Sequence, residues 1–110
     1  MNFKLEYIAC AANHYLDIEL IRTDLPHTHL YPINISSGIV FCGYRHLHCL
    51  YVMIAMTGKK QHQAGKEIQG FLTSKNRFVD REEAAKIAIA CGQISKLQYS
   101  NKDLYSEDLY

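Results

Sequence analysis

Basic, polar and aromatic residues gather in the stretch from Gly70 to Ala88, where a short turn leads into a predicted helix. Arginine forks hold phosphate groups through paired hydrogen bonds, and aromatic faces stack on nucleobases. This junction is therefore the first candidate for a ligand site, and its chemistry favours a nucleotide-sized anion. The residues that could take part are Phe71, Asn76, Arg77, Phe78 and Arg81.

A further pair, Arg45 and His46, opens another predicted helix and adds a second basic group. An ordinary structural role is open for each candidate, because phenylalanines often belong to a core, surface arginines are often solvated, and an asparagine often forms a turn. Taken together, these residues favour binding, and Arg77 and Arg81 are the best phosphate ligands at the first junction.

Metal binding and catalysis are less well supported. The densest group of metal-ligating residues is Cys42, His46, His48 and Cys49, but neighbours on a helix point apart, and Cys42 precedes the turn. For the same reason, His48 and Cys49 do not form a nucleophile–base pair. The sequence has no GxSxG, HExxH or Walker-type motif. We therefore expect a protein that is not an enzyme and has no metal site or cofactor.

The chain has 110 residues, which predicts a single domain, residues 1–110. A formal net charge of +1 is too small to indicate duplex nucleic acid as a partner. The longest apolar run, Cys49–Met56, is too short to cross a bilayer, and the first residues lack the order of a secretory signal. We therefore expect no membrane association, a cytoplasmic location and four free, mostly buried thiols.

The first third of the chain is the least clearly patterned. Residues 3–22 read as one or two strands meeting near residues 13–14, while a helix over residues 15–21 competes with that interpretation. Residues 23–37 contain both prolines and read as a long connection. The apolar run 38–43, bounded by glycines, predicts a buried strand.

The rest of the chain predicts two main helices and a hairpin. The helix over residues 45–57 is apolar around most of its circumference, and Gly58 suits its C-terminal end. After a polar loop at 59–66 comes the hairpin 69–80, and then a helix over 81–91 that begins with a capping box formed by Asp80 and Glu83. A further strand is predicted at 94–99, followed by a tail that docks on the domain.

These elements predict an α+β fold in which an antiparallel sheet packs with two main helices. The helix over 45–57 needs cover on more than one side, and the alanines of the second helix leave a slim surface on which another helix could approach. The chain has few other elements to supply that cover. We therefore expect a homo-oligomer.

Four segments resemble the small phage proteins of the first Thoeris anti-defence family. They lie between about Gly38 and the end of the chain: Gly43-Tyr44-Arg45-His46, the run from Gln69 to Ala85, Ala90-Cys91-Gly92-Gln93-Ile94, and Leu104–Tyr110. The first 37 residues carry no such resemblance.

The resemblance implies a non-enzymatic sponge, which sequesters the cyclic ADP-ribose isomer made by a bacterial TIR-domain sensor. Members of that family are α/β proteins that assemble as dimers or as hexamers built from dimers, with nucleotide sites at subunit interfaces. Some also hold cyclic oligonucleotides, which leaves cyclic di- or trinucleotides open as further ligands.

On this basis we expect Arg45 and Arg77 to bind the pyrophosphate of the signal, and Phe71 or Phe78 to stack on its adenine. His46, Asn76 and Arg81 complete the expected site. Two alternatives stay open, namely a small phage nucleotide hydrolase and a protein-binding inhibitor of a host defence factor.

Overall fold

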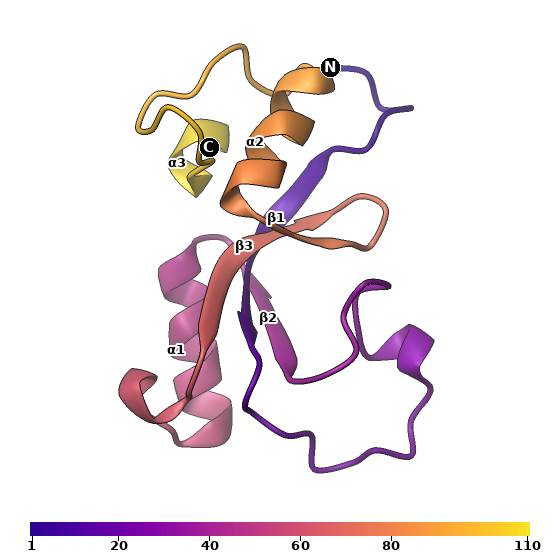
Figure 1. Ribbon diagram of the computed structural model, residues 1–110, viewed down its shortest axis with the longest axis vertical. Helices are drawn as coiled ribbons and strands as arrows, with labels where there is room; N and C mark the ends of the chain where they lie inside the picture. The colour runs from indigo at the N-terminus through magenta and orange to yellow at the C-terminus, as the bar shows by residue number, and fades with distance from the viewer.

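A computed structural model describes all residues, 1–110. Four strands form one antiparallel sheet in the order β2-β1-β3-β4 (Figure 1). The strands are β1 (Ile8–Tyr15), β2 (Ile39–Gly43), β3 (Glu67–Thr73) and β4 (Phe78–Asp80).

The helices are short, and two of them are substantial. These are α1 (His46–Thr57) and α2 (Arg81–Ala90), while α3 is a single turn near the C-terminus (Ser106–Leu109). Two 3₁₀ turns lie in the connections, η1 (His27–His29) and η2 (Gln61–Gln63). The predicted α+β class, with an antiparallel sheet and two main helices, is confirmed. No helix has the length and apolar character needed to cross a membrane.

β1 is a single continuous strand in the middle of the sheet. Asn13 and His14 do not interrupt it, because their backbone is paired on both sides, with β2 and with β3. The competing helix over residues 15–21 is wrong, since Tyr15 ends the strand and the chain then continues without a helix until η1.

β2 forms as predicted, but it is an edge strand and not a buried one. Phe41 is its only buried side chain, and Cys42 is exposed. The strand is apolar because α1 packs against one of its faces. One of its long edges has no neighbouring strand.

The hairpin of β3 and β4 is confirmed, and two residues explain its shape. Asn76 takes the left-handed conformation (φ 57°) in the turn, which asparagine tolerates better than most residues. At Gly70, a Cβ atom would come within 2.0 Å of the Val79 carbonyl oxygen and 2.9 Å of the Phe78 ring. Glycine is therefore required where β4 closes against β3.

α1 and α2 begin and end close to the predicted residues. Arg45 is the N-cap of α1, and Gly58 ends that helix in the left-handed conformation (φ 72°). At α2, the Asp80 carboxylate accepts a hydrogen bond from the Glu83 N–H (2.8 Å). The reciprocal half of the predicted capping box is missing, because the Glu83 carboxylate bonds to Arg77 instead.

The main core lies between one face of the sheet and the two helices. Phe71 and Val79 project from the sheet onto this face, as their register shows, and both are almost completely buried. The slim alanine surface of α2 packs here, as do Met53 of α1 and Leu104 of the C-terminal segment. Small side chains let α2 approach the strands closely, so Phe71 fills the centre of the core.

The connection between β1 and β2 covers part of the opposite face of the sheet (Figure 1). The Asn34 amide donates to the Phe78 carbonyl oxygen (2.6 Å) and accepts from the Phe78 N–H (2.8 Å). His14 meets the Ser37 carbonyl oxygen at 2.8 Å and lies edge-on to the Phe78 ring. The Asn34 side chain thus takes the place of a fifth strand along β4.

The predicted strand over residues 94–99 does not form. These residues pair with no strand, although Ile94 and Leu97 still pack against the core. β4 is closed by Asn34, and β2 lies at the far edge of the sheet, so no strand edge is within reach. The tail docks as expected, since Leu104 and Ser106 are buried.

Replacement of Phe71 by alanine should lower the free energy of unfolding by about 3–5 kcal/mol, because it leaves a cavity at the centre of the core. Urea denaturation followed by circular dichroism measures this change. Tyr51→Ala, at an exposed position of α1, is the control and should change stability by less than about 1 kcal/mol. Equal effects of the two substitutions would contradict this description of the core.

Candidate functional site

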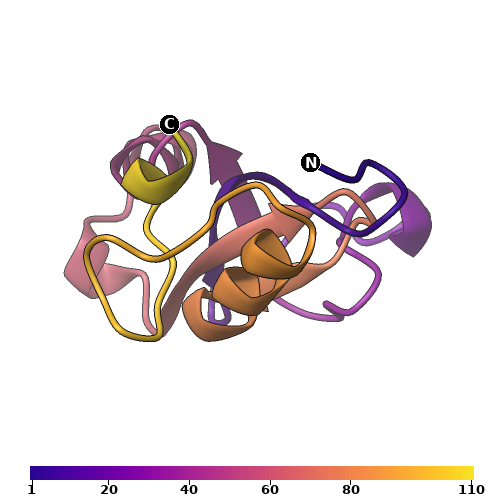
Figure 2. The ribbon, with the colours of Figure 1, turned by 90° about the horizontal axis from the view of Figure 1, so that it is seen from above.

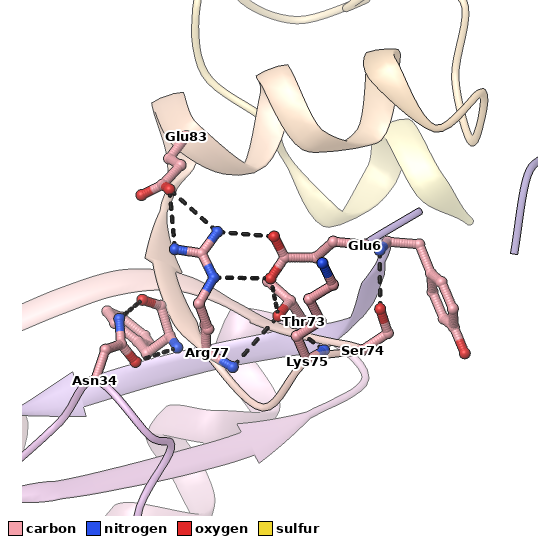
Figure 3. Close-up of polar contacts among 9 residues, drawn as sticks. Glu6, Asn34, Thr73, Ser74, Lys75, Arg77 and Glu83 are labelled. Atoms are coloured by element: carbon pink, nitrogen blue, oxygen red, sulfur yellow. Dashed lines mark hydrogen bonds and ion pairs between the residues drawn. The ribbon is translucent and has the colours of Figure 1, made fainter. Parts of the chain in front are cut away.

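Arg77 is held by two carboxylates at the junction between the hairpin and α2 (Figure 3). Its Nε and Nη2 donate to the two oxygens of Glu6, both at 2.8 Å, and its Nη groups approach Glu83 at 3.3 Å. The Thr73 hydroxyl also donates to Glu6 (2.6 Å). This is a paired guanidinium–carboxylate contact that ties the segment before β1 to the hairpin.

The electrostatics of this cluster oppose anion binding. Hydrogen bonding from Arg77 is the largest influence on Glu6 and lowers the pKa of its carboxyl group from 4.5 to about 2, and the bond from Thr73 acts in the same direction. The same contact raises the pKa of Arg77. Two negative charges already surround this guanidinium, so a pyrophosphate would have to displace Glu6 or Glu83. The expected role of Arg77 as a pyrophosphate ligand does not fit this geometry.

The expected aromatic and imidazole ligands lie inside the molecule. Phe71 has no exposed surface, and Phe78 is buried on the opposite face of the sheet. His46 is buried against the Phe71 ring and meets the Gly70 carbonyl oxygen at 2.7 Å. Burial lowers the pKa of His46, which favours the neutral imidazole. In this structure, none of the three presents a free face to a nucleotide, and Asn76 serves the hairpin turn.

Arg81 is the guanidinium that lacks a carboxylate. Nη1 donates to the Leu104 carbonyl oxygen (2.9 Å) and Nη2 to Gln69 Oε1 (2.7 Å), while the Tyr105 ring lies 4.5 Å from the guanidinium carbon. No acidic side chain comes within 4.0 Å of it. Burial lowers the pKa of Arg81, because its positive charge is partly removed from water.

Arg45 occupies a similar position at the start of α1. Its guanidinium carbon lies 4.7 Å from the Tyr44 ring and 5.0 Å from the Tyr110 ring. Nη1 donates to the Ser106 hydroxyl (3.1 Å), and Nη2 donates to the Tyr110 main-chain oxygen. Its closest carboxylate is Glu107, at 3.6 Å. Arg45 therefore has one carboxylate partner, Glu107, together with the Ser106 hydroxyl, the Tyr110 oxygen and two aromatic rings.

The C-terminal segment Leu104–Tyr110 joins these two arginines. Arg81 contacts Leu104 and Tyr105, while Arg45 contacts Ser106 and Tyr110. Seen from above, α3 lies beside the first turn of α1 (Figure 2). Two cations that are distant in sequence are thus brought to one segment, and the structure groups Arg45 with Arg81 and not with Arg77.

A strip of polar side chains lies beneath this segment, on the helix-covered face of β1 and β3. Asn13 stands opposite Gln69, and Tyr15 stands opposite Glu67. Asn13 Oδ1 and Glu67 Oε2 are buried without a hydrogen-bond partner. Buried polar atoms are rarely left unpaired, and each costs about 1–3 kcal/mol. The strip is therefore the part of the core whose polar groups are least satisfied, and Gln69 links it to Arg81.

The cysteines and histidines do not form a metal site. No group of three or more histidine, cysteine or acidic side chains is placed to hold an ion. All four cysteines are free thiols, as expected, but only Cys49 and Cys91 are buried. Cys42 is exposed, and the influence of its thiol lowers the pKa of Cys10 to about 7.

Sequence reasoning missed most of the groups that surround the arginines. The missed residues are Glu6, Tyr44, Gln69, Tyr105, Ser106 and Tyr110. The terminal aromatic pairs did predict a docked tail, yet nothing in the spacing showed which cation they would meet. Glu6 lies 71 residues from Arg77, so no local pattern connects the two.

The four-stranded antiparallel sheet, with two helices on one face and two tail-bound arginines, defines a small α+β protein. The family model described as phage T4 y16D protein matches residues 7–110. The chain belongs to this phage protein family. Searches of curated proteins and of solved structures found no match.

Glu6→Gln should remove an acid-sensitive contribution to stability. Because folding lowers the pKa of Glu6 to about 2, its ion pair stabilises the native state above pH 4.5, and this contribution is lost as the pH falls toward 2. Urea unfolding between pH 7 and pH 2 should therefore show a smaller loss of stability in Glu6→Gln than in the wild type. Glu82→Gln, an exposed position on α2, is the control. Parallel pH profiles for Glu6→Gln and the wild type would contradict this role.

Proposed function

We propose that this phage protein binds a cyclic ADP-ribose isomer made by a bacterial immune sensor and sequesters it without cleaving it. Three lines of argument support the proposal. The family is a phage family, and four segments of the sequence resemble Thoeris anti-defence proteins. The third argument, which carries the choice of residues, is the environment of Arg81.

Arg81 is a partly buried cation that makes no ion pair within 4.0 Å, and Asp103 and Glu107 act on its charge only from further away. A charge removed from water is costly unless an opposite charge pairs with it. Leu104 and Gln69 supply only neutral acceptors, and Tyr105 supplies only the face of a ring. A pyrophosphate would provide the missing charge, and the planar guanidinium matches the geometry of its oxygens. We therefore assign the pyrophosphate to Arg81 and Arg45 in place of Arg77 and Arg45.

Tyrosines take over the role first given to phenylalanines. The Tyr105 ring lies against Arg81. The Tyr44 and Tyr110 rings both lie against Arg45 and pack edge to face on each other, with centroids 4.6 Å apart. Tyr44 and Tyr110 also keep exposed surface, so an adenine could stack on them without opening the core. As in the sequence hypothesis, we propose a homo-oligomer, in which a second copy encloses the ligand more fully than one chain does.

The hydrolase alternative has one arrangement to consider. The Ser106 hydroxyl donates to Glu107 (2.8 Å), as a nucleophile would to a base. Ser106 is only 1% exposed, however, and the same bond lowers the pKa of Glu107, which makes its carboxylate a weaker base. This pair is better explained as a support for Arg45. The alternative of a protein-binding inhibitor rests on the exposed apolar residues of α1 and needs no nucleotide.

Arg81→Ala should weaken binding of the cyclic ADP-ribose isomer at least tenfold, the effect of losing one charge-assisted hydrogen bond. Arg45→Ala should act likewise, while Lys86→Ala, an exposed position on α2, should bind as the wild type does. Isothermal titration with the purified product of a TIR-domain enzyme measures the affinities. A thermal melt of each variant separates lost binding from lost folding, because Arg81 also holds Leu104.

Arg77→Ala gives the opposite pattern, with a lower melting temperature and unchanged affinity. Lost affinity in Arg77→Ala alone would move the site back to the hairpin junction. Chromatography of the nucleotide released by heating should recover the cyclic compound in stoichiometric amount. Linear ADP-ribose would favour the hydrolase, and no bound nucleotide would favour the protein-binding inhibitor.

A further inference from the structure

The two edge strands of the sheet, β4 and β2, differ in whether their outer backbone groups are hydrogen-bonded. β4 is closed by the Asn34 side chain, which bonds to both the N–H and the carbonyl oxygen of Phe78. β2 has no such cover, because no side chain or loop hydrogen-bonds to its outer edge. Proteins usually block an exposed edge with a charge, a proline or a bulge. β2, with the sequence Ile-Val-Phe-Cys-Gly and a regular register, has none of these.

The register identifies the groups that point outward. Leu16 N–H bonds to the Lys66 carbonyl oxygen, which continues the β1–β3 register. Bonded and non-bonded pairs alternate along an antiparallel ladder, so the odd-numbered residues of β1 bond to β2. Their partners in β2 are Ile39, Phe41 and Gly43. The N–H and C=O groups of Val40 and Cys42 therefore point away from the sheet.

An apolar flank of α1 lies above this edge. Gly43 packs against His48 and Cys49, and Met56 lines the same cavity as Phe41, so the flank that carries positions 48, 52 and 56 faces the β2 side. Val52 is 41% exposed and Met56 is 75% exposed. The adjoining cavity of about 670 Å³ is also lined by Leu20 and Ile21. An unpaired strand edge and an apolar surface thus lie side by side.

We propose that two copies of this chain pair through their β2 edges, in an antiparallel arrangement around a two-fold axis at Phe41. Val40 of each copy then stands opposite Cys42 of the other, in bonded pairs that use the outward-pointing groups. The same axis brings the apolar flanks of the two α1 helices to one interface, as a two-fold contact requires. This pairing continues one sheet through both copies.

A second copy fits this surface better than a different partner, for two reasons. β2 and α1 contain no Asp, Glu, Lys or Arg, so the surface meets its own copy without like-charge repulsion. The strand pairs with itself without any change of register. The chain also exposes 6810 Å², compared with roughly 6,200 Å² expected for a monomer of its mass. The excess is in the direction expected for a protomer that loses surface on assembly.

Light scattering on the purified chain, at micromolar concentration and without nucleotide, tests this interface independently of the proposed function. The expected mass is 25.2 kDa, twice the 12.6 kDa of the chain, or an even multiple of the single chain. Cys42→Pro removes an outward N–H group and leaves the bonds to β1 intact, so it should give a monomer. A mass of 12.6 kDa for the wild-type chain would overturn the proposal, and an interface for a different protein would then be the better explanation of the surface.

Val52→Glu tests the helix flank and remains decisive if Cys42→Pro does not fold. It should also give a monomer with an unchanged circular dichroism spectrum. Ile89→Glu is the matched control, since it makes the same kind of change at an exposed position of α2 and should leave the assembly intact. Hydrogen exchange gives a second measurement, because the amides of Val40 and Cys42 should be protected in the wild type and should exchange freely in Val52→Glu. An assembly that survives Val52→Glu with these two amides unprotected would overturn the β2 pairing.

Discussion

The contacts of three arginines with the segments that flank the sheet are the interactions on which the rest of this structure depends. Arg77 holds Glu6, just before β1, and Arg81 and Arg45 hold the segment Leu104–Tyr110. These contacts complete the core, since Leu104 fills space that α1 and α2 leave open. The partners of each arginine also determine whether its positive charge is neutralised. Arg77 is neutralised by two carboxylates, whereas Arg81 is not neutralised by any.

This division explains why one kind of residue has two different roles. A guanidinium saturated by carboxylates stabilises the fold and offers little to an anion, because binding would require the loss of an existing ion pair. A guanidinium bonded to carbonyl and amide oxygens keeps its positive charge available. Arg81 contributes to tertiary structure through Leu104 and still has no carboxylate within 4.0 Å. Tertiary structure therefore fixes the position of Arg81, and this would lower the entropic cost of binding an anion there.

The local features of the sequence predicted local structure well. The hairpin, both main helices, the N-cap at Asp80 and the left-handed Gly58 all depend on residues close together in the chain, and the structure confirms them. Long-range partners were not predictable. Arg77 pairs with Glu6 and Arg45 pairs with Tyr110, and no periodicity links residues so far apart in sequence. The strand predicted at 94–99 failed for the same reason, because alternation shows that a segment could pair but not whether an edge is free.

Aromatic residues can pack in a core or stack on a ligand at the surface, and Phe71 and Phe78 pack in the core. Both residues lie near basic groups in sequence, which suggested stacking on a base, but the alternation of β3 and β4 directs them to opposite faces of the sheet. Phe71 enters the helix-covered core, and Phe78 packs on His14 under the connection held by Asn34. Tyrosines replace them at the surface, because a tyrosine can keep its hydroxyl in water while its ring packs against a cation. The aromatic residues closest to Arg45 and Arg81 therefore come from the segment that docks last in sequence and from the turn before α1. Any ligand held by these two arginines would thus contact the C-terminal segment and the turn before α1. The role of the sheet would be to hold these two segments in place through its buried faces.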